Sequence, residues 1–127
     1  MKVLDASAVL ALLNAEPGAE TVAEQLATGD AVVSAVNFAE IMGKVFERGV
    51  PEPDAAALWR RLTIGIEPVS AAVALRAALL QPLTRPLGLS LGDRCCLALA
   101  QELGGAVVVT ADRAWRAVPG FEFVFVR

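Results

Sequence analysis

The stretch Met1-Lys2-Val3-Leu4-Asp5-Ala6-Ser7-Ala8-Val9-Leu10 sets a carboxylate between two apolar runs. The residues before Asp5 have the character of a buried strand, and a helical pattern begins at Ser7 or Ala8. A carboxylate at a buried strand end needs a partner, and no obvious basic partner lies nearby in the sequence. The stretch therefore predicts a strand that passes directly into a helix, with Asp5 at the junction as a candidate functional residue.

Strand-like and helical patterns alternate along the rest of the chain. Further strands are expected at 31–33, 66–69, 106–109 and 121–126. Helices are expected at 8–14, 19–28, 35–48, 54–63, 71–81 and 90–103, with N-caps at Ser34 and Ser90 and a stop at Pro82. The alternation predicts an α/β fold with a mainly parallel central sheet of about five strands.

Composition predicts one compact domain over residues 1–127. Hydrophobic residues make up 56% of the chain and its mean hydropathy is +0.57, so we expect a sheet covered on both faces and an oligomer interface. Apolar runs such as 8–13 and 95–100 are far shorter than the roughly 20 residues of a membrane span, so no membrane segment is expected. Asp5 falls where a signal peptide would be apolar, which favours a cytoplasmic protein.

Four acids stand at strand ends or near helix starts: Asp5, Glu40, Asp93 and Asp112. The chain has no histidine, which excludes a Ser-His-Asp triad, an imidazole base and a histidine zinc site. In a parallel sheet the carboxyl ends of the strands share one edge, where ligands gather, and we expect the four acids there. Carboxylates that converge without basic partners call for a hard divalent cation. A net charge of −3 argues against a protein that binds polyanions through bulk charge.

Three of these acids also have a purely structural explanation. Asp93 fits a capping box with Ser90, Glu40 fits a charge on a solvated helix face, and Asp112 fits a turn before a short helix. On the helix at 35–48 the expected polar stripe is Asn37, Glu40, Lys44 and Glu47. The expected apolar face of that helix is Ala35, Phe38, Ala39, Met42 and Val45. It is the four acids as a set that favour function.

Four motifs, in their order and spacing, resemble the PIN-domain nucleases, and among these the small VapC-type toxins. The motifs are Val3-Leu4-Asp5-Ala6-Ser7, the pair Asn37 and Glu40, Ser90-Leu91-Gly92-Asp93, and Thr110-Ala111-Asp112-Arg113-Ala114-Trp115. The resemblance covers essentially the whole chain, and the motifs are short singly but fairly specific together. One departure is Ala6, because the family often has a hydroxyl residue directly after the first acid, and Ser7 is the nearest hydroxyl here.

The resemblance implies a PIN-like three-layer α/β/α sandwich and a metal-dependent endoribonuclease whose carboxylates hold Mg²⁺ or Mn²⁺. Asp5, Glu40 and Asp93 would be the core ligands, and Asp112 would complete the site or orient a water. The polar supports of these ligands would be Ser7, Asn37, Ser90 and Thr110. Phosphate contacts would be Lys44, Arg94, Arg113 and Arg116, for which a solvated surface is the alternative interpretation.

Partners follow from the same resemblance and from composition. The resemblance implies RNA as the substrate and a cognate antitoxin that docks in a groove and holds the nuclease inactive. Apolar residues in excess of one small core favour a homodimer, or a higher assembly with the antitoxin.

Other phosphate chemistries conflict with the sequence. Dehalogenase-like phosphatases need a second acid two residues after the first, where Ser7 stands, and a lysine that stabilises the phospho-aspartate. Receiver domains need the same lysine, but no lysine follows Lys44. Neither G-x-G-x-x-G nor a P-loop pattern occurs. The remaining alternative is a catalytically silent PIN-like module that binds RNA or protein.

Overall fold

A five-stranded parallel sheet forms the centre of the molecule, and the computed structural model describes it together with all other residues from 1 to 127. Its strands are β1 (Lys2–Leu4), β2 (Ala31–Ser34), β3 (Gly65–Glu67), β4 (Val107–Thr110) and β5 (Phe123–Phe125). Their order is β3-β2-β1-β4-β5, and every neighbouring pair is parallel. The predicted parallel sheet is confirmed, with the strand that leads into Asp5 at its middle.

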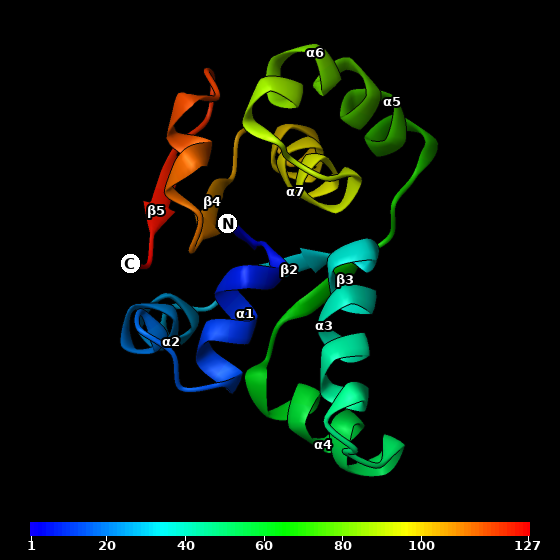
Figure 1. The fold of residues 1–127 in the computed structure, drawn as a ribbon, viewed down its shortest axis with the longest axis vertical. Helices are drawn as coiled ribbons and strands as arrows, with labels where there is room; N and C mark the ends of the chain where they lie inside the picture. The colour runs from blue at the N-terminus through cyan, green and yellow to red at the C-terminus, as the bar shows by residue number, and fades with distance from the viewer.

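Helices cover both faces of the sheet, which gives the three-layer α/β/α sandwich expected (Figure 1). On one face lie α1 (Ala6–Leu13), α2 (Ala19–Ala27), α3 (Ala35–Glu47) and α4 (Glu52–Leu62). On the other lie α5 (Ala71–Leu79), α6 (Gln81–Thr84), the 3₁₀ turn η1 (Arg85–Leu87) and α7 (Leu91–Glu102). The 3₁₀ turn η2 (Arg113–Ala117) joins β4 to β5. None of the helices combines the length and apolar character that a bilayer crossing requires.

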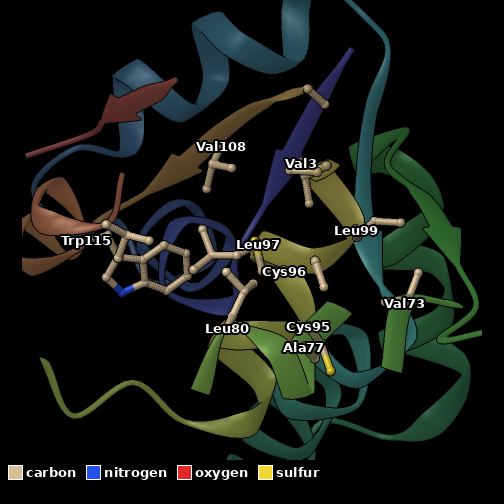
Figure 2. Packing of buried hydrophobic residues seen from close by; sticks show 14 of the residues in the cluster. Val3, Val73, Ala77, Leu80, Cys95, Cys96, Leu97, Leu99, Val108 and Trp115 are labelled. Carbon is tan, nitrogen blue, oxygen red and sulfur yellow. The ribbon is translucent and has the colours of Figure 1, made fainter. Parts of the chain in front are cut away.

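The inner strands are apolar at nearly every position because each successive side chain faces a different core. Val3 and Val108 belong to the cluster that α5 and α7 cover, where Figure 2 shows them with Leu97 and Trp115. The next residues on the same strands, Leu4 and Val109, belong to the cluster covered by α1, α3 and α4. Alternation of side chains along a strand thus turns a continuous apolar run into two separate cores.

The register of the sheet brings particular residues to its carboxyl edge. Leu4 pairs with Val109, so the next residues along, Asp5 and Thr110, leave neighbouring strands at the same level. The backbone N–H of Asp5 still donates to the carbonyl of Val109 at 3.1 Å, which extends the ladder to the carboxylate residue itself. On the other side of β1, strand β2 ends at Ser34. The three central strands therefore end in buried polar residues.

Several sequence expectations need correction. Pro82 does not leave a plain loop behind it, because a proline in the first turn suits a helix start, and α6 begins beside it. Strand β3 spans Gly65–Glu67, earlier and shorter than expected. On α3 the expected polar residue Asn37 is fully buried, and the expected apolar residue Ala39 is exposed. The helix buries a wider face than predicted because its first turns also contact α7.

Candidate active site

Asp5 is the buried centre of the carboxyl edge, with 2% of its surface exposed. It is the N-cap of α1, and its Oδ1 accepts from the backbone N–H of Ala8 at 2.9 Å. The Ser7 hydroxyl lies 2.8 Å from both carboxylate oxygens, and the Thr110 hydroxyl donates to Oδ2 at 2.6 Å. Neutral donors from α1 and β4 therefore hold the carboxylate, and no basic side chain forms an ion pair with it.

This environment changes the acidity of Asp5. Burial raises the pKa of its carboxyl from 3.8 to about 6, although the hydrogen bonds from Thr110, Ala8 and Ser7 act in the opposite direction. The negative charge of Asp93 raises the pKa further. A negative charge on Asp5 is therefore costly unless a positively charged group comes close to it.

A second network positions Glu40 at the same edge. Ser34, the N-cap of α3, accepts from the Asn37 backbone N–H at 3.1 Å and donates its hydroxyl proton to Asn37 Oδ1 at 2.8 Å. The Asn37 Nδ2 group then donates to Glu40 Oε2 at 3.0 Å and to the Gly92 carbonyl at 3.2 Å. This buried amide therefore links the start of α3, the Glu40 carboxylate and the first turn of α7.

The predicted capping box at the start of α7 is confirmed. The Ser90 hydroxyl accepts from the Asp93 backbone N–H at 3.2 Å, and Asp93 Oδ2 accepts from the Ser90 backbone N–H at 2.8 Å. One carboxylate oxygen of Asp93 thus stabilises the helix, while the same charge acts on Asp5. Structural and functional interpretations of Asp93 are compatible, because a carboxylate has several acceptor sites.

Cys96 shows that three of the acids lie near one another. This thiol is fully buried in α7, and burial raises its pKa well above the usual value. The charges of Asp5, Asp93 and Glu40 raise that pKa further. Three carboxylates, at the start of α1, on α3 and at the start of α7, are therefore each near enough to act on this one buried thiol.

Asp112 reaches this edge mainly through its backbone. Its N–H donates to the Thr110 hydroxyl at 3.1 Å, and Thr110 in turn holds Asp5. The Asp112 carboxylate caps η2 by accepting from the Ala114 N–H at 3.0 Å, as a turn former would. It also lines an open cleft of about 490 Å³ together with Ser7. Asp112 therefore stands beside the Asp5 network rather than among the acids near Cys96.

Basic residues flank the site in a way that sequence reasoning identified only in part. A polar cleft of about 540 Å³ beside Ser7 is lined by the cations Lys44, Arg48 and Arg127. Arg48 and Arg127 were missed because both are far from any acid motif. Arg127 lines both clefts, and its guanidinium donates to Glu16 at 3.1 Å. Arg127 follows the last strand and lies in no motif, so the sequence pattern around it does not indicate a functional role.

The other predicted phosphate contacts are engaged within the chain. The Arg94 guanidinium donates to the Ala77 carbonyl at 3.0 Å, and Arg116 lies over the Phe125 ring at 5.3 Å. Arg113 donates through Nε to the Arg127 carbonyl at 2.7 Å and also lines the cleft of Asp112. Of the predicted contacts, Lys44 and Arg113 face the clefts beside Ser7.

The donor set suits a hard divalent ion in kind. Every side chain concerned offers carboxylate oxygen, and none of the three ion pairs in the structure includes Asp5, Glu40, Asp93 or Asp112. No group of three or more carboxylate, thiol or imidazole side chains lies close enough together to hold a metal ion by itself. Mg²⁺ is usually held by one or two carboxylates and several waters, so an open set of this kind fits it.

The comparisons with known proteins agree with this architecture. Residues 2–120 match the PIN domain family. No curated protein is similar enough in sequence to count as a relative. The fold is similar to a chain of a toxin–antitoxin complex from Klebsiella pneumoniae, with a TM-score of 0.77, 19% identity, and coverage of 100% of this chain and 98% of that chain.

Two further solved structures share the fold. A chain of the DNA-bound VapBC from Salmonella typhimurium has a TM-score of 0.76 and 17% identity, with 99% of this chain and 98% of that chain covered. A chain of FitAcB from Neisseria gonorrhoeae has a TM-score of 0.71 and 22% identity, with 98% and 97% covered. The family match spans nearly the whole sequence and includes all four acids, so this chain belongs to the PIN domain family.

Proposed function

We propose that this protein is a metal-dependent endoribonuclease that acts as one PIN-like unit over residues 1–127 in the cytoplasm. The observation that carries the proposal is Asp5, a buried carboxylate at the end of the central strand that has neutral donors, no cation, and a raised pKa. The charge of Asp93 acts on Asp5, and the charges of Asp93 and Glu40 both act on the Cys96 thiol. Membership of the PIN family supports nuclease chemistry for such a cluster.

The proposed roles follow from the contacts of each residue. Asp5, Glu40 and Asp93 would hold Mg²⁺ or Mn²⁺, and Asp112 would complete the site or orient a water. The chemistry that such an ion supplies is a more acidic bound water and stabilisation of charge on the phosphate. Ser7 and Thr110 keep the Asp5 carboxylate in one orientation from two sides.

The remaining supports act on the other two acids. Asn37 holds one oxygen of Glu40, and Ser90 fixes Asp93 through the capping box. Because Asp93 gives one oxygen to that box, its other oxygen is the one left for the ion. The proposed ligands are therefore each oriented by a polar neighbour of the same chain.

RNA would lie along the two clefts that meet at Ser7 and Arg127. We propose Lys44, Arg48, Arg113 and Arg127 as phosphate contacts because they line the two clefts, ahead of Arg94 and Arg116, which line neither. Arg48 carries the strongest case among them, because it lines the larger cleft and forms no ion pair.

We further propose that the protein is the toxin of a toxin–antitoxin pair. Similar folds occur in toxin–antitoxin complexes, including the one from Klebsiella pneumoniae. A mainly apolar cleft of about 450 Å³ between α3 and α4 suits an apolar segment of an antitoxin. Phe38 and Trp59 line it in edge-to-face contact, and Phe46 at its margin is 47% exposed.

A second apolar surface suits a second copy of the chain. Leu75 and Leu79 on α5 and Leu83 on α6 are 63%, 69% and 52% exposed and recur at every fourth residue. Exposed leucines on two successive helices fit an isologous interface better than they fit a single inserted segment. We therefore expect Leu79→Asp to give monomers that still bind the antitoxin. Phe46→Asp is expected to leave the dimer intact but to lose antitoxin binding. Light scattering measures the oligomeric state, and co-purification measures antitoxin binding.

The decisive experiment measures cleavage of a mixed set of structured RNAs with and without Mg²⁺ or Mn²⁺. Wild type is compared with Asp5→Asn and Asp93→Asn, and circular dichroism checks that each variant is folded. The proposal expects cleavage that requires the ion and is lost in both variants. RNA binding without cleavage under every ion would instead favour a catalytically silent module.

A further inference from the structure

Gly92 lies directly beneath the Glu40 carboxylate. A Cβ atom at position 92 would overlap Glu40 Oε1 and would stand 2.8 Å from Cδ and 2.9 Å from Oε2, all closer than real Cβ atoms approach other atoms. The backbone of Gly92 is ordinary helix, so no unusual dihedral angle calls for glycine there. What the position requires is empty space, and the carboxylate occupies that space.

Asn37 holds the carboxylate over this gap. Its Nδ2 group bridges Glu40 Oε2 and the Gly92 carbonyl at 3.0 and 3.2 Å. Asn37 is itself fully buried, and Ser34 fixes its amide oxygen. Glu40, in contrast, is an exposed residue on a flexible side chain, so its carboxylate has many rotamers available unless neighbours restrict it.

The rest of the chain offers a contrast that isolates this effect. Gly43 lies one turn further along α3, and a Cβ atom there would meet nothing within 4 Å. Alanine is a better helix former than glycine at either position. At position 43 the change would only add a methyl group in open space, whereas at position 92 it would displace Glu40.

We propose that Gly92 is a positioning residue, whose bare Cα admits the Glu40 carboxylate to the first turn of α7 next to Asp93, where the Asn37 amide fixes it. The inference rests on the proposed function, because it concerns how Glu40 is presented to a divalent ion. Glu40 can swing away from a methyl group at low cost, since only the far end of its side chain is in contact. Loss of position, not loss of folding, is therefore the expected result of Gly92→Ala.

The test compares Gly92→Ala with Gly43→Ala in the full chain. Binding of Mn²⁺ is measured by calorimetry without RNA, and RNA cleavage is measured as a function of Mn²⁺ concentration. Gly92→Ala is expected to weaken Mn²⁺ binding by about 10- to 100-fold, as loss of a ligand-orienting contact does. Gly43→Ala is expected to match wild type. Equal Mn²⁺ affinity in wild type and Gly92→Ala would overturn the inference.

A thermal unfolding cycle keeps the inference testable even if the wild type neither binds Mn²⁺ nor cuts RNA, a result that would refute the proposed function alone. The cycle comprises wild type, Gly92→Ala, Glu40→Ala and the double variant. If the methyl group and the carboxylate compete for one space, Gly92→Ala raises Tm more in the Glu40→Ala background, by roughly 2–4 °C. Additive changes in Tm, or a large loss of Tm in both backgrounds, would make Gly92 a merely structural residue.

Discussion

The carboxyl edge of the sheet buries a charged group, whereas the α5–α7 layer buries apolar side chains and keeps its charges at the surface. At the edge, Asp5 is buried without an ion-pair partner, and the negative charge of Asp93 acts on it. In the α5–α7 layer, apolar side chains such as Ala77 and Leu97 pack together (Figure 2), and the ion pair between Arg76 and Glu102 lies outside at the surface. The buried charge at the carboxyl edge destabilises the fold, and the apolar burial in the α5–α7 layer offsets that destabilisation.

The contrast teaches where stability and function separate in this chain. Every buried polar side-chain atom of the edge has a hydrogen bond, since Trp115 Nε1 is the only such atom without one in the molecule. The buried polar atoms of the edge thus have hydrogen-bond partners, but the Asp5 carboxylate has no oppositely charged partner. Changes that neutralise it are expected to stabilise the fold, whereas changes in the α5–α7 layer are expected to destabilise it.

The largest expected effect on stability comes from a substitution in the α5–α7 layer. Leu97→Ala removes a fully buried side chain from the cluster beneath α5, and it is expected to lower the free energy of unfolding by about 2–5 kcal/mol. Leu91→Ala serves as the control, because Leu91 is 58% exposed. Urea unfolding of both variants measures the difference. Similar losses in the two would show that the cluster is not the source of stability.

The second effect concerns the pH dependence of stability at the edge. The pKa of Asp5 is raised from 3.8 to about 6 in the folded protein, so the folded state binds this proton more tightly than the unfolded state does. The resulting stabilisation is complete below pH 3.8 and is lost as pH rises through about 6. The shift corresponds to on the order of 3 kcal/mol, measured by urea unfolding without divalent ions.

Asp5→Asn is the matched variant for this prediction. Its amide oxygen can still accept from the Ala8 N–H, and its NH₂ group can donate to the Thr110 or Ser7 hydroxyl. We expect the variant to exceed wild type in stability at pH 7 and to approach it near pH 4, with no RNA cleavage at either pH. Equal pH profiles for the two proteins would contradict the raised pKa of Asp5.

A smaller effect separates the two roles of the capping box. Ser90→Ala removes the hydroxyl that accepts from the Asp93 N–H and is expected to cost about 1 kcal/mol. Ser90→Asp restores an N-cap acceptor but adds a negative charge beside Asp93. If both variants lose Mn²⁺ affinity while only Ser90→Ala loses stability, the box serves the ion site as well as the helix.

The smallest effect tests the surface ion pair that joins α5 to α7. Arg76 and Glu102 are 2.7 Å apart, but their side chains are 45% and 38% exposed. Solvent screening limits such pairs, so Arg76→Gln is expected to change the free energy of unfolding by less than about 1 kcal/mol. A loss as large as that of Leu97→Ala would overturn the view that burial holds this layer together.

Sequence patterns predicted the strands, the N-caps and the layers because these depend on local chemistry. Apolar runs without alternation marked strands covered on both faces, and Ser34 and Ser90 marked helix starts by their hydroxyl groups. The effect of Asp93 on Asp5 at the end of β1 also agrees with the topology, since parallel strands share one carboxyl edge. These are rules about neighbours in the chain or in the sheet.

Contacts between distant elements could not be predicted in the same way. The burial of Asn37 depends on the Gly92 carbonyl, which is 55 residues away in sequence, and nothing in the local pattern of α3 reveals it. The cations Arg48 and Arg127 line one cleft, and Arg127, which follows the last strand, reaches it by donating to Glu16 in the loop after α1. Such features depend on tertiary packing, which overrides the amphipathic pattern of a single helix.

The position of Thr110 has a consequence for the newly made protein. The hydroxyl that holds Asp5 lies 105 residues further along the chain, on a strand that must pair beside β1. At a synthesis rate of about 5–20 residues per second, several seconds separate the emergence of these two residues from the ribosome. A nascent chain thus carries its first acid long before it can assemble the site, so translation of the message is nearly complete before the product acquires an organised carboxylate edge.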